Sequence, residues 1–212
     1  MYFFKSLRWG LFWGWGILTL MDTLVSLTDE EIVARTLEDR QVFSLIISRY
    51  EAKLGRYIGR LGVRTYDDRV DVLQEIFIKA YKNLNSFDGG FKFSSWIYRI
   101  AHNEAISWYR KQKVRPEGNL VTDGDDILQL LQNGEVGADV EFDKGINQRE
   151  LSLAMAKIDT KYQQALILRY FEQKEYDEIS DILKVPLGSV GTLIFRGKKQ
   201  LKAALNENSL RI

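Results

Sequence analysis

Aromatic and basic residues alternate closely between residues 87 and 116. This stretch, FDGGFKFSSWIYRIAHNEAISWYRKQKVRP, has a single acidic residue, Glu104, after its first few positions. Its rings and cations include Phe91, Phe93, Trp96, Tyr98, Trp108 and Tyr109 among Lys92, Arg99, Arg110, Lys111, Lys113 and Arg115. A core helix does not favour so many cations, and a solvated helix does not favour so many rings. Aromatic faces can stack unpaired bases, at about 1–3 kcal/mol per base, and cations attract the nucleic-acid backbone.

A second pattern with chemical meaning lies between residues 175 and 205. It predicts a short helix, a turn with Pro186 and Gly188, and a longer helix from Ser189, which is helix-turn-helix spacing. One face of the second helix is apolar: Val190, Ile194, Leu201 and Leu205. Another face is polar and can enter a major groove: Ser189, Thr192, Arg196 and Lys199. An antiparallel helix pair with a solvated basic face is the alternative, but the cations from Arg196 to Lys202 favour DNA.

Composition excludes several kinds of chemistry. The 212 residues include no cysteine and one histidine, His102, so disulfides, thiol catalysis and multi-histidine metal sites are excluded. We therefore expect no catalytic residue, no metal and no cofactor. For His102 a surface or DNA-facing position is a better interpretation than a catalytic base. The formal net charge is only +1, but the charges are segregated along the chain, and local charge steers a partner more than the total does.

Helical periodicity dominates the elements that must position these residues. Apolar spacing predicts helices near residues 29–37, 39–61, 67–84 and 93–113, and Thr28 with Glu31 forms a capping-box pattern at the first. Acidic residues and glycines between 114 and 146 predict a flexible linker, with one short helix at 127–131. Helical patterning then resumes. The sequence predicts an all-α chain of two small domains, 22–113 and 147–212, joined by the acidic linker.

Residues 1–21, MYFFKSLRWGLFWGWGILTLM, form an apolar leader with two cations. The apolar run is shorter than the ~20 residues of a membrane-spanning helix, and no signal-peptide cleavage site follows it. Three interpretations stay open. The start codon could be assigned too early, with Met21 as the first residue; the leader could be a weak membrane-surface anchor; or it could be a structured extension.

Three segments, in this order, resemble the bacterial RNA polymerase sigma factors of the extracytoplasmic-function (ECF) subfamily. DVLQEIFIKAYKNLNSF, residues 71–87, resembles the polymerase-docking helix of that family. FKFSSWIYRIAHNEAISWYRK resembles the helix that melts and reads the minus-ten promoter element. LILRYFEQKEYDEISDILKVPLGSVGTLIFRGKKQL is similar to the domain that reads the minus-thirty-five element. The resemblance covers about residues 22–205.

The resemblance implies a role for particular residues of this chain. It implies polymerase binding by Asp71, Gln74, Glu75 and Lys79. It implies minus-ten DNA binding by Phe87, Lys92, Arg99, Asn103, Arg110 and Lys111. It implies minus-thirty-five binding by Ser189, Thr192, Phe195, Arg196 and Lys199. In the helix after Phe91, we expect Arg99, Asn103 and Arg110 to share a face opposite the buried side, which is Ile97, Ile100, Ala101, Ala105 and Trp108. The turn before it, residues 85–91, is expected to hold one flipped base, with Gly89 and Gly90 permitting close approach.

The implied partners are core RNA polymerase, through its beta and beta-prime subunits, promoter DNA, and an anti-sigma factor that is membrane-bound or soluble. No small-molecule substrate is expected. The implied location is the cytoplasm, with membrane association through an anti-sigma factor or the leader as the alternative. Gly191 and Leu193 replace basic or hydroxyl residues of many relatives, so contacts there are expected to be fewer. Glu175 replaces the usual Ser or Thr cap, which weakens side-chain capping.

Other interpretations stay open on the residues alone. The docking helix also fits an ordinary amphipathic core helix, with Leu73, Phe77 and Tyr81 at four-residue spacing. A free-standing helix-turn-helix regulator would use the second domain without polymerase. A metal-dependent helical enzyme would need carboxylates such as Asp67, Asp68, Asp71 and Glu75, which are spread around a helix and lack histidine partners.

Overall fold

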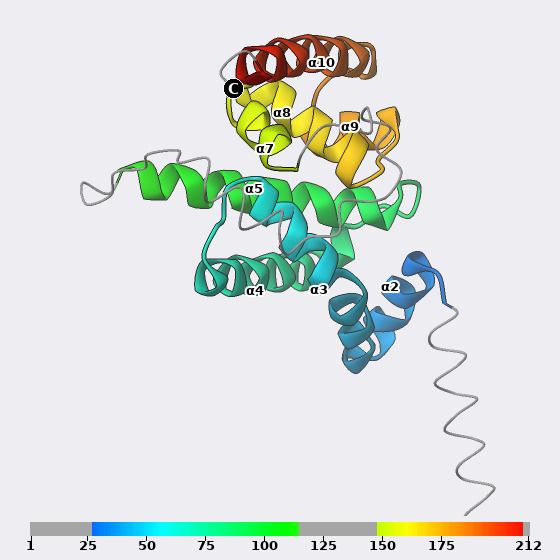
Figure 1. Cartoon of the computed structure of the whole chain (residues 1–212). Helices are drawn as coiled ribbons and strands as arrows, with labels where there is room; N and C mark the ends of the chain where they lie inside the picture. The colour runs from blue at the N-terminus through cyan, green and yellow to red at the C-terminus, as the bar shows by residue number, and fades with distance from the viewer. Residues whose placement is uncertain (1–26, 115–147, 210–212) are drawn as a thin grey trace, which may run out of the picture. The chain divides into compact units, whose positions relative to one another are not determined.

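The computed structural model describes residues 27–114 and 148–209, and every regular element in them is helical (Figure 1). The first range contains α2 (Asp29–Glu38), η1 (Arg40–Val42), α3 (Phe43–Arg60), α4 (Tyr66–Lys82), η2 (Leu84–Ser86) and α5 (Phe93–Val114). The second contains α7 (Gln148–Ala156), α8 (Thr160–Leu166), the π-helical turn η3 (Ile167–Phe171), α9 (Tyr176–Leu183) and α10 (Leu187–Ser209). The predicted all-α fold is confirmed.

Two sequence predictions fall outside the described residues: the apolar leader and the short helix at 127–131 within the acidic linker. Among the described helices, none is both long and apolar enough to cross a membrane.

Polar caps define where the first helices begin. Thr28 Oγ1 accepts the Glu31 N–H at 3.2 Å, and Glu31 Oε2 accepts the Thr28 N–H at 2.7 Å, so the predicted capping box at the start of α2 is confirmed. The single helix predicted over 39–61 is interrupted. The Asp39 side chain accepts the Gln41 N–H at 2.9 Å, and this bond sets a 3₁₀ turn, η1, before α3 begins at Phe43.

The core of the first described range forms where α3, α4 and α5 meet. Leu54, Tyr57, Ile76 and Ile97 are completely buried. The rings of Tyr57 and Tyr98 lie 5.1 Å apart and join α3 to α5. A Cβ atom on Gly55 of α3 would lie only 3.5 Å from Leu73 of α4, so these two helices approach closely. Burial of this apolar surface fixes how the polar sides of α4 and α5 are turned.

The second described range is organised around α10, which packs against α7, α8 and α9. A Cβ atom on Gly197 would lie 3.0 Å from Leu166 Cγ, so the small residue lets α10 and α8 approach. The chain leaves α8 through the π-helical turn η3, and the left-handed residue Gln173 (φ 52°) follows two residues after its end. This turn redirects the chain into the segment before α9.

The predicted helix-turn-helix is present, with a shifted boundary. The left-handed Lys184 (φ 55°, ψ 45°) ends α9. The sequence had predicted Gly188 in the turn and the helix start at Ser189. In the structure α10 begins at Leu187, so Gly188 belongs to the helix. Pro186 precedes the first helical residue, where its missing N–H costs no hydrogen bond. At the start of α9, Glu178 Oε2 accepts the Glu175 N–H at 3.1 Å and supplies part of the cap that was expected to be weak.

His102 is in the interior, and the expected surface position is wrong. It is 8% exposed, and its Nδ1 lies 2.9 Å from the hydroxyl oxygen of Tyr57. The position follows from the helical repeat, since residue 102 is four residues after the buried Tyr98. Burial lowers the pKa of His102 from 6.5 to about 4, because the protonated ring would lose its hydration. The histidine is therefore neutral in the folded protein at pH 7.

We predict that His102 makes folding stability depend on mild acid. The unfolded chain gains a proton on this residue below about pH 6.5 and the folded chain only near pH 4, so stability should fall between these values. The loss should approach about 3 kcal/mol at pH 4. His102→Gln keeps a neutral polar group and should remove this part of the slope. Urea unfolding followed by circular dichroism at pH 7, 6, 5 and 4 measures it; parallel pH curves for the two proteins would contradict the prediction.

Candidate nucleic-acid interface

One face of α5 carries three polar residues at helical spacing. Arg99, Asn103 and Arg110 are four and seven residues apart, which places them on the same side of an α-helix. Asn103 and Arg110 are exposed, and Arg99 is half-buried. Of the five residues expected on the buried side of the helix, Ile97, Ala101 and Ala105 are buried, whereas Ile100 and Trp108 are half-buried. The expected shared face is confirmed, whereas its binding to DNA stays a prediction.

Most aromatic rings of the stretch support the fold. Phe93 and Trp96 are buried. Phe87, which is half-buried, packs edge-on against both of them, with ring centroids 5.4 and 5.6 Å away. Tyr50 of α3 completes the cluster, 5.8 Å from Phe93. Phe91, 56% exposed, is the ring of this stretch most available for stacking.

The turn before α5 leaves room beside Gly89, whereas a Cβ atom on Gly90 would lie 3.3 Å from Asp88 Oδ1. Asp88 Oδ1 accepts the Gly90 N–H at 3.0 Å, and the Asp88 carbonyl accepts the Phe91 N–H at 3.0 Å. A Cβ atom on Gly89 would meet nothing within 4 Å, so open space lies over this position. Neither glycine has a positive φ. The turn therefore offers space for a base, but it does not use the conformational freedom of glycine.

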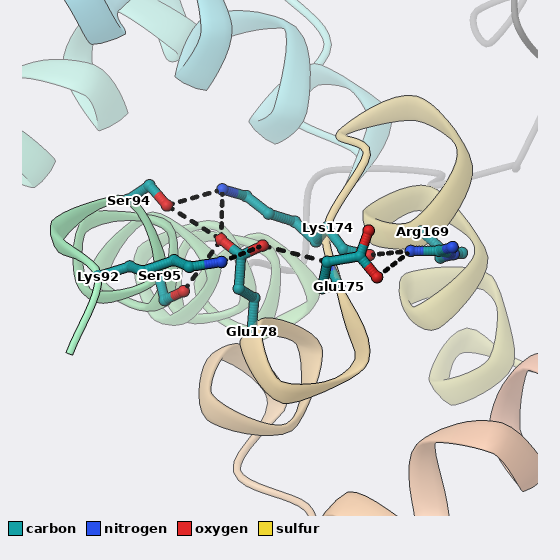
Figure 2. Close-up of polar contacts among 7 residues, drawn as sticks. All are labelled: Lys92, Ser94, Ser95, Arg169, Lys174, Glu175 and Glu178. Atoms are coloured by element: carbon teal, nitrogen blue, oxygen red, sulfur yellow. Dashed lines mark hydrogen bonds and ion pairs between the residues drawn. The ribbon is translucent and has the colours of Figure 1, made fainter.

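Two predicted DNA-binding lysines lie apart from the Arg99–Asn103–Arg110 face. Lys92 is just before α5, and its Nζ lies 3.6 Å from Glu178 of α9 (Figure 2). Lys111 lines a hollow between α4 and α5 that it shares with Asp71, Glu75 and Glu104. Lys111 is thus grouped with acidic residues, because it lies about 100° around the helix from Arg110.

The predicted polymerase-binding residues are accessible on α4. Asp71, Gln74 and Glu75 are exposed. Lys79 differs from them, because its Nζ is 2.7 Å from Glu104 Oε1 of α5. Its side chain is still 46% exposed. Lys79 therefore helps join α4 to α5 in addition to any role at the surface.

Sequence reasoning missed an outer apolar row on α4. Its members are the exposed residues Tyr66 (73%), Val70 (44%), Ile78 (37%) and Tyr81 (38%), and Gln74 continues the spacing between them. Tyr81 had been grouped with Leu73 and Phe77, but of these three only Phe77 is buried. The row could have been found from a second four-residue repeat, 66–70–74–78, that is offset by two positions from the buried repeat Val72–Ile76–Ala80.

The polar face predicted for the second helix of the helix-turn-helix is present in α10, and three of the four residues predicted for its apolar face are buried; the fourth, Leu205, is half-buried. Val190, Ile194 and Leu201 are at most 4% exposed. The outward residues are Thr192, Phe195, Arg196 and Lys199, with Ser189 half-buried at their edge. Phe195 is 70% exposed, which is unusual for a phenylalanine. The Arg196 guanidinium beside the Tyr162 hydroxyl lowers the pKa of that phenol.

In residues 27–114 and 148–209, no group of three or more His, Cys, Asp or Glu side chains could hold a metal ion. The carboxylates Asp67, Asp68, Asp71 and Glu75, which a helical metalloenzyme would need, do not converge into such a group.

Comparison with known families matches both parts of the chain. Residues 46–115 match Sigma-70 region 2, and residues 148–201 match Sigma-70, region 4. The chain is 33% identical over 189 residues to the ECF RNA polymerase sigma-E factor of Haemophilus influenzae, covering 83% of this chain and 94% of that one. It is 32% identical over 177 residues to the ECF RNA polymerase sigma factor SigW of Bacillus subtilis, covering 80% and 91%.

Solved structures share the fold. CnrH in complex with the cytosolic domain of CnrY gives a TM-score of 0.63 at 20% identity, covering 84% of this chain and 97% of that one. The sigma factor RpoE from Bartonella quintana, in complex with the anti-sigma factor NepR, gives 0.55 at 18% identity, covering 77% and 96%. Two sigma-70 regions in the family's order and identities of 32–33% over more than 90% of the curated relatives' length lead to one assignment. The chain belongs to the ECF family of RNA polymerase sigma factors, non-enzymatic subunits that direct RNA polymerase to promoters.

Proposed function

We propose that α10 reads duplex DNA at the minus-thirty-five element while α5 holds the melted minus-ten strand. The observation that carries this division is the presence of two exposed polar faces, Arg99–Asn103–Arg110 on α5 and Thr192–Arg196–Lys199 on α10, each backed by a buried apolar side. Each face is turned outward by the buried apolar side of its own helix. One chain therefore has two DNA surfaces that can do different work.

The chemistry of α10 suits an intact double helix. A helix fits the major groove, where Arg196 can bind a guanine edge with two hydrogen bonds and Lys199 can pair with a phosphate. The exposed ring of Phe195 can contact a thymine methyl group. Gly191 and Leu193 are half-buried, which supports the expectation of fewer contacts there.

The start of α5 suits single-stranded DNA. Phe91 offers an exposed ring for stacking, and the space over Gly89 offers room for an unstacked base. Arg99, Asn103 and Arg110 supply hydrogen-bond donors and positive charge along the following 17 Å or so of helix, at about 1.5 Å per residue. Bases reach such a surface only after they leave the stack, which is the step that melting requires.

The exposed side of α4 is the proposed docking surface for core polymerase. It combines the acidic and amide residues Asp71, Gln74 and Glu75 with the outer apolar row. Apolar area supplies affinity at an interface, and charges orient the partner and exclude others.

We also infer that an anti-sigma factor holds this protein inactive, because RpoE, which shares the fold, was solved in complex with the anti-sigma factor NepR. The cytoplasm, where core polymerase works, is the proposed location. The chain's lack of cysteine agrees with a reducing compartment.

Charge reversal on α4 should weaken polymerase binding. We expect Asp71→Lys with Glu75→Lys to lower the affinity for core polymerase by about tenfold or more, since like charges at an interface cost several kcal/mol. Ile78→Ser should lower it through lost apolar contact. Glu51→Lys, the same change at an exposed position of α3, is the matched control. A fluorescence titration with labelled protein measures the affinities. Equal affinity of all variants, with unchanged circular dichroism, would exclude α4 as the docking surface.

Recognition and melting should be separable by mutation. Arg196→Ala should weaken duplex binding by the polymerase complex by about 1–3 kcal/mol if Arg196 makes a bidentate base contact. Arg196→Lys keeps the charge without the paired donors and should recover only the phosphate part of the binding. Asn103→Ala should leave duplex binding nearly intact and reduce strand opening, because Asn103 is expected to meet bases only after unpairing.

A gel shift reports duplex binding, and permanganate reactivity of unpaired thymines on the same promoter reports opening. A template with a premelted bubble should rescue Asn103→Ala more than Arg196→Ala, because the bubble removes the unpairing cost without restoring duplex contacts. The division of work between α5 and α10 is wrong if both variants lose duplex binding equally and neither responds to the bubble.

A further inference from the structure

A buried carboxylate from α9 binds the start of α5. The side chain of Glu178 is 9% exposed. Its Oε1 accepts hydrogen bonds from Ser94 Oγ (3.1 Å), Ser95 Oγ (3.3 Å) and Lys174 Nζ (3.3 Å). Its Oε2 lies 3.6 Å from Lys92 Nζ. Figure 2 shows these groups converging on the Glu178 carboxylate from α5 and from the segment before α9.

A second carboxylate joins the same two parts of the chain. Glu172 Oε1 is 2.5 Å from Arg60 Nη1 at the end of α3, and Glu172 Oε2 accepts the Tyr98 hydroxyl of α5 at 2.8 Å. The side chains of Arg60 and Glu172 are 10% and 6% exposed, so this ion pair is largely buried. Lys174, between the two carboxylates in sequence, lies over the Tyr98 ring at 4.4 Å. The segment from η3 to α9 is thus fixed to α3 and α5 by ion pairs and hydrogen bonds.

Glu172 and Glu178 are each paired with a cation. The contact between α5 and the segment from η3 to α9 therefore depends on ion pairs, which can be exchanged for other ionic partners. Burial acts to raise the pKa of Glu178, but the Glu175 N–H, Lys174 and Ser94 outweigh it and hold that pKa below its usual range. Glu178 is therefore ionised at neutral pH. A buried ion pair gains little net stability, because desolvation offsets the attraction, whereas losing one partner is strongly unfavourable. An interface of this kind can separate when a competing ion and water replace the partners.

The groups that hold Glu178 are also those that would hold a DNA phosphate. Lys92 supplies a cation, Ser94 and Ser95 supply hydroxyl donors, and all three are at the end of α5 that the proposed function gives to the melted strand. A carboxylate and a phosphodiester are both anions with two acceptor oxygens. They cannot occupy these donors at the same time.

Promoter geometry also conflicts with the contact. The minus-ten and minus-thirty-five elements are about 25 base pairs apart, which is about 85 Å of B-DNA at 3.4 Å per step. Compact domains of about 60 to 90 residues have radii of gyration of about 10 to 12 Å. Domains that touch through Glu178 and Lys92 cannot place one DNA surface on each element of a straight duplex.

We propose that Glu178 is an intramolecular competitor for nucleic acid: in the free chain it occupies Lys92, Ser94 and Ser95 in place of a DNA phosphate and holds α9 against α5. This inference rests on the proposed role of the start of α5. Binding to polymerase and promoter then requires the two domains to separate. The contact limits binding of DNA by the free chain.

The test uses the full chain, which has no cysteine and can therefore be labelled at two introduced ones. Glu51→Cys on α3 and Thr160→Cys on α8 are exposed positions outside the residues of both DNA faces, and energy transfer between two dyes reports separation. Anisotropy of a labelled single-stranded dT20 oligomer reports nucleic-acid binding. Glu178→Gln should lower energy transfer and raise dT20 affinity by up to about tenfold, the gain expected if about one tenth of the free chain is open.

Two further variants make the result specific. Tyr98→Phe removes one bond to Glu172 without altering the α9 cap, so it should act in the same direction even if Glu178→Gln unfolds α9, as circular dichroism would show. Lys92→Met added to Glu178→Gln should abolish the gain in dT20 affinity while energy transfer stays low. Unchanged energy transfer and unchanged affinity in Glu178→Gln and Tyr98→Phe would overturn the proposal.

A fall in energy transfer without a gain in affinity would also overturn it, because the contact would then exist without competing for nucleic acid. The proposed function is judged separately by the promoter-opening assay of Asn103→Ala. That residue does not contact the Glu178 site, so the two failures are distinguishable.

Discussion

Burial of α5 on more than one side is the constraint on which the candidate surfaces depend. α5 packs against α4, and also against α9. Small side chains at Ala101 and Ala105 allow close packing, and the larger Tyr98 and His102 contact groups outside α4. Little of the helix circumference is then left for solvent. Exposed polar residues of the helix, among them Asn103 and Arg110, are held in a defined direction because the rest of the helix cannot rotate.

Much of the fold was predictable because it depends on the spacing of apolar and polar residues that are close in the sequence. The helices, the Thr28–Glu31 capping box and the apolar and polar faces of α10 all follow from contacts between residues three or four apart. The shared face of Arg99, Asn103 and Arg110 was predictable for the same reason. Boundaries were less certain, since Asp39 and Lys184 end or interrupt helices through a single side-chain bond or a single left-handed residue.

Features that join distant residues were not predictable from one sequence. Lys92 and Glu178 meet through tertiary packing, and no local pattern links them. His102 looked like a surface residue because burial of a lone histidine depends on which helices cover it. Phe87 was predicted to bind DNA, and the structure shows it packed against Trp96; composition alone does not separate rings that build a core from rings that contact a ligand.

The chemical nature of the contact between α5 and the segment before α9 sets its response to temperature. Carboxylates, ammonium groups, a guanidinium and hydroxyls supply its specific contacts. Heat capacity rises when apolar surface is exposed to water and falls when polar surface is exposed, so the two contributions partly cancel when such a contact opens. The enthalpy of separation should therefore be nearly constant over the growth range, unlike that of unfolding either core. Heating alone would therefore do little to separate α5 from the segment before α9. A change in the ions that pair with these side chains would be a more effective signal.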